Sequence, residues 1–250
     1  MNTSQFAELD AYRSTNDTLP RMSVVIPTYN EAKALPFLLH DLRALPFVVE
    51  IIVADGGSTD HTPAVAQELG ARVIATGKGR GLQLRAGAAV ARAALLGFLH
   101  ADVRLDDSAI RALADLVNTP QTDNVAYAFN LAIDALPRAY RIIEFGAKLR
   151  SRFLHLPYGD QGLFLSRTLY DAVGGYSDIP IMEDVVIVRA LARQAQIQLM
   201  PASIRVSARR WERDGVWTRW VANSVLLARW YAGASPAALA AAYEHRRTRD

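Results

Sequence analysis

Four short polar clusters, each directly after a run of apolar residues, carry the side chains of this 250-residue chain that are best suited to bind a charged ligand. In chain order these clusters are PTYNE at 27–31, DGGSTD at 55–60, GKGRG at 77–81 and HAD at 100–102. A glycine-rich turn that starts a helix presents N–H groups that favour anions, and Lys78, Arg80 and Arg85 strengthen that preference here. Opposite such a turn, the carboxylate of Asp102 could hold a divalent cation through oxygen. The clusters therefore predict a site for a phosphate group and a metal ion.

Each cluster also has an interpretation that needs no ligand. The end of the first cluster can start a helix, and Ser58 with Asp60 can supply ordinary helix caps. The glycine-rich segment can be a tight turn, and Asp102 can be a surface carboxylate. Only the convergence of all four clusters on one place would favour a binding site over these alternatives.

Hydrophobic periodicity places the clusters at the ends of strands. Short apolar runs alternate with segments of helical periodicity through the first half of the chain. The expected strands are 23–28, 50–54, 72–75 and 97–100, and the expected helices are 35–42, 62–69, 82–95 and 106–117. This alternation predicts an α/β fold in which a parallel sheet has helices on both faces. Because ligands bind beyond the carboxyl ends of such strands, we expect the four clusters to meet at one edge.

The pattern changes after Pro120. A strand of period 2 is expected over 125–133, followed by a helix from about 137 to 153, a short strand ending at Ser166 and a helix to Val173. A helix at 181–193, strands at 197–200 and 204–208, and an amphipathic helix at 216–231 complete the expected elements. We therefore expect a polar arm at 1–20, a single domain at 21–211, and a basic, aromatic helical tail at 212–250.

The motifs resemble those of a known enzyme family. PTYNEA after the first strand, DGGSTD after the second, HAD after the fourth and the later Met182-Glu183-Asp184 are similar in order and spacing to the inverting family 2 glycosyltransferases of the GT-A fold. The resemblance extends from Ser23 to Trp211, and KGRGxQ, YGDQG and GGY are most similar to a small, stand-alone bacterial branch. It implies a mainly parallel GT-A-type sheet flanked by helices, with a Rossmann-like nucleotide-sugar-binding half at about 21–119 and an acceptor half at about 120–211.

The reaction that the resemblance implies is transfer of a sugar from a nucleoside-diphosphate sugar to an acceptor hydroxyl, in a single metal-assisted displacement with inversion. The residues expected to bind the donor are Pro27, Tyr29, Glu31, Asp55, Lys78, Arg80, Arg85 and Arg210. The first three would line the nucleoside pocket, Asp55 would bind the base or the ribose, and Arg210 would bind the diphosphate.

The resemblance also implies a metal site and a catalytic base. Asp102 matches the last aspartate of the DxD signature that holds a divalent metal, and His100 replaces the first aspartate. Because imidazole suits Mg²⁺ poorly, Mn²⁺ is the expected metal, with weaker metal binding as the alternative. Glu183-Asp184 matches the pair that supplies the base, and Asp184 is the favoured member. A plain carboxylate at a helix N-terminus is the simpler interpretation of Asp184.

Two segments of the second half of the chain are expected to contact the acceptor. Asp160 and Gln161 lie in a loop that precedes an apolar strand. The segment Ser207–Trp211 (SARRW) resembles the QxxRW box of processive relatives, in which Trp211 would meet the acceptor. Ser207 replaces glutamine there, which argues against a processive polymerase.

Composition narrows the expected partners. The chain has no cysteine, which excludes Cys-ligated zinc, iron–sulfur clusters and thiol nucleophiles. Its net charge is +3, and 9 Arg against 4 acidic residues follow from position 205 onward. This favours phosphates or an anionic surface over a nucleic acid. Trp217 and Trp220 beside arginines suit the inner face of a membrane with a lipid-linked acceptor, and packing on the body is the alternative. With neither a signal peptide nor a spanning segment expected, the protein is predicted to be cytoplasmic, with this peripheral membrane contact.

Three other functions are compatible with parts of the pattern. The replacement of an aspartate by His100 would fit a degenerate transferase that binds a nucleotide-sugar without catalysis. A nucleotidyltransferase would share phosphate binding at strand ends. A dinucleotide-dependent oxidoreductase fits less well, because GKGRG is not GxGxxG and follows the third expected strand rather than the first.

Overall fold

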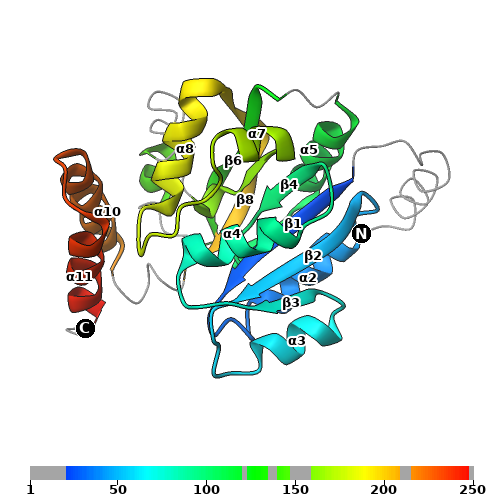
Figure 1. Cartoon of the computed structure of the whole chain (residues 1–250), viewed down its shortest axis with the longest axis horizontal. Helices are drawn as coiled ribbons and strands as arrows, with labels where there is room; N and C mark the ends of the chain where they lie inside the picture. The colour runs from blue at the N-terminus through cyan, green and yellow to red at the C-terminus, as the bar shows by residue number, and fades with distance from the viewer. Residues whose placement is uncertain (1–20, 120–122, 135–139, 147–158, 209–214, 248–250) are drawn as a thin grey trace.

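The described part of the chain forms one sheet of eight strands, in the order β3-β2-β1-β4-β7-β6-β8-β5 (Figure 1). The computed structural model describes residues 21–119, 123–134, 140–146, 159–208 and 215–247. Four neighbouring strands are parallel: β1 (Met22–Thr28), β2 (Val48–Asp55), β3 (Arg72–Ala75) and β4 (Leu95–Phe98). Parallel strands need crossover connections, and here they are α2 (Leu35–Arg43), α3 (Thr62–Glu68) and α4 (Arg80–Val90). The alternation predicted for the first half is confirmed.

The other side of the sheet is mixed. Its strands are β5 (Val103–Arg104), β6 (Val125–Asp134), β7 (Leu163–Ser166) and β8 (Gln196–Ser207). β7 runs antiparallel to both β4 and β6, whereas β6 and β8 are parallel and β5 is antiparallel to β8. The expected α/β sheet of GT-A type is confirmed. The strand expected to end at Ser166 is β7, and its antiparallel direction and the short β5 were not predicted.

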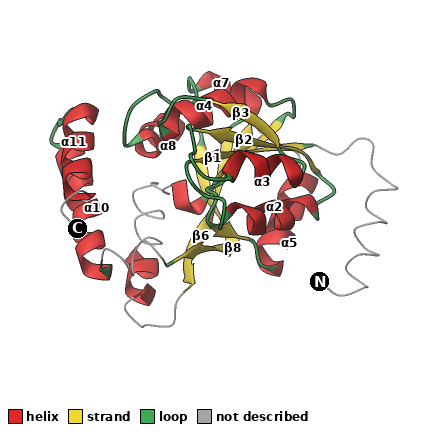
Figure 2. Ribbon diagram, turned by 90° about the horizontal axis from the view of Figure 1, so that it is seen from below, coloured by secondary structure: helices red, strands yellow, loops and turns green. Residues whose placement is uncertain are grey.

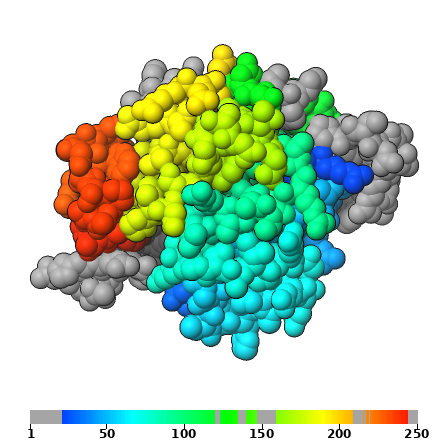
Figure 3. Space-filling model, in the orientation of Figure 1, coloured from blue at the N-terminus to red at the C-terminus, as the bar shows by residue number. Residues whose placement is uncertain are grey.

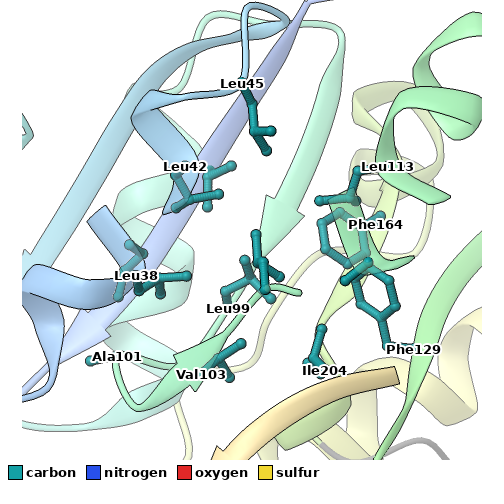
Figure 4. Packing of buried hydrophobic residues seen from close by; sticks show 14 of the residues in the cluster. Leu38, Leu42, Leu45, Leu99, Ala101, Val103, Leu113, Phe129, Phe164 and Ile204 are labelled. Carbon is teal, nitrogen blue, oxygen red and sulfur yellow. The ribbon is translucent and has the colours of Figure 1, made fainter. Parts of the chain in front are cut away.

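Helices cover both faces of the sheet (Figure 2). One apolar cluster joins the sheet to α2, α3 and α5 (Asp107–Asn118), and a second joins it to α4, α7 (Arg167–Ala172) and α8 (Glu183–Gln194). Successive residues of β1 divide between them, because side chains alternate along a strand: Val24 and Ile26 belong to the first cluster and Val25 to the second. Figure 4 shows part of the first cluster, including Leu38, Leu42 and Leu113.

The helix expected at 82–95 is shorter and begins earlier than predicted. α4 starts at Arg80, directly after the glycine turn, and ends at Val90, so that β4 begins at Leu95 rather than at 97. Ala91 has an extended conformation (φ −68°, ψ 144°). The Arg167 side chain donates to the carbonyl groups of Ala88 and Ala91 at 3.1 and 2.8 Å, which satisfies acceptors that the helix leaves open at its end.

The two strands expected at 197–200 and 204–208 are one strand, β8. Its pairing with β6 shifts register opposite Ala128 and Asn130, which accommodates Pro201 within the strand. The Asn130 side-chain amide donates to the carbonyl groups of Met200 and Ala202 at 2.9 and 3.2 Å. These bonds give hydrogen-bond partners to carbonyl groups of β8 where its backbone pairing with β6 is interrupted.

The tail forms two helices, α10 (Val216–Tyr231) and α11 (Pro236–Arg247), at one end of the molecule beside α8 (Figures 1 and 3). Leu227 and Trp230 of α10 pack against the second apolar cluster, and Arg189 of α8 lies 5.2 Å from the ring centre of Tyr231. Among the described residues, no helix combines the length and apolar character needed to cross a bilayer.

Candidate active site

The loops after β1 and β2 are locked together by hydrogen bonds. Asn30 has a left-handed backbone (φ 56°), and its side-chain oxygen accepts from the Thr59 amide at 2.8 Å. The backbone amide of Asn30 donates to the Ser58 hydroxyl, and the backbone amide of Glu31 donates to the Thr62 hydroxyl, both at 2.8 Å. Since β1 and β2 are adjacent and parallel, their carboxyl ends share one edge, and these bonds make one rigid surface of PTYNEA and DGGSTD. Sequence reasoning did not select Asn30 as a site residue.

Asp55 organises the DGGSTD turn. Its side chain is almost fully buried. One carboxylate oxygen accepts from the Thr28 hydroxyl at 3.0 Å and from the Ser58 hydroxyl at 2.5 Å. The other accepts from the backbone amides of Gly57 and Ser58 at 3.1 and 2.8 Å. The predicted contact of Asp55 with a base or ribose stays a prediction, and a ligand would have to share these bonds.

Gln83 joins α4 to the carboxyl ends of β1 and β2. Its side-chain amide, in a buried side chain, donates to the carbonyl groups of Thr28 at 2.7 Å and Ala54 at 2.8 Å. A Cβ on Gly56 would lie 3.0 Å from this amide nitrogen, so the turn passes close above it. The signal for Gln83 was its place in KGRGxQ, but nothing local in the sequence indicates partners more than twenty residues away.

A contact between Lys78 and Tyr29 joins the glycine-rich turn to the loop after β1. The Lys78 ammonium lies 4.3 Å from the centre of the Tyr29 ring, in cation–π distance. Tyr29 is 40% exposed, so the surface beside it is open. Pro27, near the end of β1, and Glu31, in the loop after it, lie on either side of Tyr29 in the chain and are half-buried. Residues predicted for the nucleoside pocket therefore lie together with one of the predicted cations.

Arg85 lies further along α4 than the other predicted cations. It is exposed on the second turn of the helix. Burial raises the pKa of Tyr170 in α7, and the positive charge of Arg85 opposes part of that rise. The predicted contact of Arg85 with the donor stays a prediction.

Arg80 connects the glycine-rich turn to the start of α8. Its guanidinium donates to the Glu183 carboxylate at 3.0 Å, and the Glu183 side chain is 3% exposed. Next to it, a Cβ on Gly81 would lie 2.2 Å from the carbonyl oxygen of Ser177, so only glycine fits there. The negative charge of Glu183 raises the pKa of Arg80. Burial raises the pKa of Glu183, and Arg80 opposes that rise.

Asp184 accepts hydrogen bonds from backbone amides rather than from a charged side chain. One of its carboxylate oxygens accepts from the Gly159 amide at 3.1 Å, and the other accepts from the Val185 amide at 2.8 Å. The side chain is half-buried, in contrast to Glu183. Asp184 is the second residue of α8, where the helix dipole favours a carboxylate. A small pocket lined in part by Tyr176, Ile187 and Val188 adjoins it.

The residues that follow β4 lie close to Asp184. A Cβ on Gly159 would lie 2.8 Å from His100 Nε2 and 3.8 Å from an Asp184 carboxylate oxygen, so both side chains lie beside this glycine. Asp102 is 8% exposed, and its charge, with those of Glu183 and Asp184, contributes to the raised pKa of Arg80. Asp102, Arg80 and the start of α8 therefore interact electrostatically in one region.

His100 and Asp102, the two residues predicted to bind a metal ion, follow β4. Among the described residues, no group of three or more His, Asp or Glu side chains could enclose a metal ion. A carboxylate oxygen and an imidazole nitrogen are nevertheless a donor set that suits Mn²⁺. The metal roles of His100 and Asp102 stay predictions.

The predicted acceptor residues are in mixed positions. Asp160 and Gln161 belong to the short helix η1 (Gly159–Gln161), next to Asp184. Gln161 is fully buried, and its amide donates to the Phe129 carbonyl at 2.8 Å. Arg210 and Trp211 lie outside the described residues. The acceptor roles of Asp160, Gln161 and Trp211 and the diphosphate role of Arg210 stay predictions.

The chain is similar to known glycosyltransferases. The family model "Glycosyl transferase family 2" matches residues 23–177. A 4,4'-diaponeurosporenoate glycosyltransferase of Staphylococcus haemolyticus is 36% identical over 99 residues, which are 36% of this chain and 26% of that protein. The low-salt glycan biosynthesis hexosyltransferase Agl6 of Haloferax volcanii is 31% identical over 151 residues, 58% of this chain and 36% of that protein. The matched regions thus span well under half of the length of these relatives.

Solved structures share the fold. Staphylococcus aureus TarS (residues 1–349) superposes with a TM-score of 0.60 at 18% identity, over 75% of this chain and 60% of that chain. Glucosyl-3-phosphoglycerate synthase from Mycobacterium tuberculosis, in complex with Mn²⁺, UDP and glucosyl-3-phosphoglycerate, has a TM-score of 0.54 at 18% identity, over 83% and 76% of the two chains. The sequence match covers more than half of the chain and the fold agrees with it, so this chain belongs to glycosyltransferase family 2.

Proposed function

We propose that this chain transfers a hexose from a nucleoside-diphosphate sugar to an acceptor hydroxyl, with inversion at the anomeric carbon. One observation carries the proposal: the ends of β1 and β2 and the N-termini of α4 and α8 are linked in one region by Asn30, Gln83 and the Arg80–Glu183 ion pair. The names of the two relatives, a glycosyltransferase and a hexosyltransferase, support it.

The donor is assigned to the side formed by β1, β2 and α4. The open face of Tyr29 suits a nucleobase, and Lys78 beside it suits the adjoining phosphate. The N-terminus of α4 offers backbone N–H groups to an anion, since no side chain caps it. The mycobacterial synthase in complex with UDP-glucose has this fold, which supports a nucleotide-sugar as donor.

Asp102 and His100 are the residues that would hold a divalent ion. Bound there, the ion would neutralise charge that develops on the leaving diphosphate. The mycobacterial synthase has been crystallised with Mn²⁺ and with Mg²⁺, each with UDP, which supports a divalent metal of either kind. The imidazole of His100 favours Mn²⁺ for this chain.

Asp184 is proposed as the general base. The acceptor oxygen bonds to the anomeric carbon as the bond from that carbon to the diphosphate oxygen breaks, and the hydroxyl proton passes to the Asp184 carboxylate. Asp184 is the accessible member of the acidic pair, whereas Glu183 is buried and bonded to Arg80. The charge that leaves with the diphosphate is stabilised by fixed cations such as Lys78 and Arg80.

The tail is proposed to contact an anionic membrane that presents the acceptor. Trp217, Trp220, Val221 and Val225 of α10 are each 45–53% exposed and recur at helical spacing. Helix α10 contains two arginines and no acidic residue, and Trp is typical of membrane interfaces. Wild-type chain should therefore sediment with vesicles that contain phosphatidylserine, and Trp220→Ser should reduce this binding. Equal sedimentation of both proteins would contradict the membrane contact.

A donor screen tests the proposed function. Purified chain is incubated with UDP- and GDP-sugars, with Mn²⁺ or Mg²⁺, and release of the nucleoside diphosphate is measured with and without a panel of lipid and small hydroxyl acceptors. We expect acceptor-dependent release with one class of donor, and thermal stabilisation by that donor. Stabilisation without any release would favour the non-catalytic binder, and release of pyrophosphate from a nucleoside triphosphate would favour a nucleotidyltransferase.

A further inference from the structure

Gly159 lies where three functional elements meet. It begins η1, its amide donates to Asp184 at the start of α8, and its Cα faces the imidazole of His100 after β4. In sequence these three residues are far apart, and Gly159 lies in the YGDQG segment, from which only Asp160 and Gln161 were predicted as site residues. The turn thus contacts both the proposed base and the proposed metal side.

Space, and not backbone conformation, requires glycine at this position. Gly159 does not have a positive φ, whereas Gly162, three residues later, has a φ of 67°. An L-residue could therefore adopt the backbone of Gly159. Its Cβ, however, would lie 2.8 Å from His100 Nε2, closer than real Cβ contacts. Any side chain at 159 must displace either the imidazole or the turn.

We propose that Gly159 is a positioning residue for sugar transfer, one that sets the Asp184 carboxylate and the His100 imidazole against the same backbone atoms. This inference rests on the proposed function, because it assigns Gly159 a role in aligning the base with the donor. The Gly159 amide fixes one oxygen of Asp184 and leaves its further acceptor positions for the hydroxyl proton. The missing side chain lets the His100 imidazole approach the same glycine.

Other contacts hold the turn that contains Gly159, so the turn cannot move freely to make room for an added side chain. Gln161 is fully buried and bonded to the carbonyl of Phe129. A Cβ on Gly162 would lie 2.8 Å from a Leu99 side-chain carbon, next to His100 in the chain. A side chain added at Gly159 therefore pushes either His100 out of place or the Gly159 amide away from Asp184, and misplacement of about 1 Å costs about 10²-fold in rate.

Substitution of Gly159 tests the proposal. Gly159→Ala is expected to lower kcat about 10²-fold, with a smaller rise in the donor KM through the displaced His100, and Gly159→Val is expected to lower kcat further. Gly146→Ala is the matched control, because that glycine has an ordinary φ and, among the described residues, no atom within 4 Å of an added Cβ. An unchanged kcat in both Gly159 variants would overturn the proposal, as would a loss confined to the donor KM.

A double-mutant cycle with His100→Ala tests the contact itself. In the His100→Ala background the added methyl group of Gly159→Ala meets no imidazole, so the variant should cost less in kcat and in Tm than it does in wild type. In wild type we expect a Tm loss of about 2–4 °C. Equal Tm losses in both backgrounds would overturn the contact.

The thermal cycle also separates this inference from the proposed function. If wild-type chain transfers no sugar to any acceptor, the proposed function fails and the role of Gly159 in transfer fails with it, whatever the Tm cycle shows. If wild type is active and the Tm cycle shows coupling but kcat does not change, only the positioning role of Gly159 fails.

Discussion

The two sides of the proposed active site are built by different means. On the donor side, the loops after β1 and β2 bond directly to each other, and Gln83 ties α4 to both strand ends. On the acceptor side, Asp184 is held by single backbone bonds, one of them from a turn 25 residues away in the chain. Residues on the donor side should therefore affect stability and donor binding, whereas residues around Asp184 should affect turnover.

The largest effect on the donor side is expected at Asp102. Asp102→Asn removes the charged oxygen ligand with little change in volume, so Mn²⁺-dependent binding of the donor should weaken by at least about 10-fold. Calorimetric titration of UDP with and without Mn²⁺ measures this. The exposed Asp115 of α5 supplies the matched control, Asp115→Asn. If UDP affinity and its dependence on Mn²⁺ are the same in Asp102→Asn and wild type, the metal site is elsewhere.

The ion pair that joins the two sides should come next. Arg80→Gln leaves the buried Glu183 carboxylate without its guanidinium partner, which should cost about 1–3 kcal/mol of unfolding free energy, toward the lower end because Arg80 is 44% exposed. Urea unfolding measures it, with the exposed Arg111→Gln of α5 as control. An unchanged free energy of unfolding would show that the pair does not join α4 to α8.

The same variant predicts a pH dependence. Burial raises the pKa of Glu183 above its ordinary 4.5, so ionisation of this carboxyl in the folded state costs stability as the pH rises above that value. Arg80 opposes this cost. The stability lost in Arg80→Gln should therefore be smallest near pH 4.5 and largest at pH 7–8. A loss that is independent of pH, or greater at low pH, would contradict the pairing.

A smaller effect is expected at Asn30. Asn30→Ala removes the acceptor for the Thr59 amide and puts alanine in a left-handed conformation, for a loss of about 1–2 kcal/mol. Asn30→Asp keeps both the acceptor and the tolerance of that conformation, so it should retain most of the stability. If the alanine and aspartate variants unfold at the same urea concentration, the bond between the loops contributes little.

Local patterns were sufficient to predict most of the framework. The leucine stripe at 35, 38, 39 and 42 predicted a covering helix, and all four side chains are buried in α2. The apolar run of β1 predicted burial on both faces, which the two clusters confirm. These features depend on the period of the side chains within one element, and a sequence displays that period directly.

The parts that were not predicted depend on contacts between distant segments. Asn30 and Gln83 act through bonds to other loops, and Gly159 acts through the absence of a side chain beside His100. β8 was expected as two strands, 197–200 and 204–208, and the Asn130 side chain that bonds to the segment between them lies on another strand. Spacing along the chain carries no information on such partners.

The claim that Asp184 is the base has the most direct test in one comparison. Asp184→Asn and the control Asp115→Asn are measured for nucleoside-diphosphate release in the presence of acceptor, and for donor affinity by calorimetry. We predict that Asp184→Asn lowers turnover by about 10²–10⁴-fold while the donor Kd stays within about 3-fold, with the control unchanged in both. Turnover equal to wild type in Asp184→Asn, with the donor bound normally, would contradict the account.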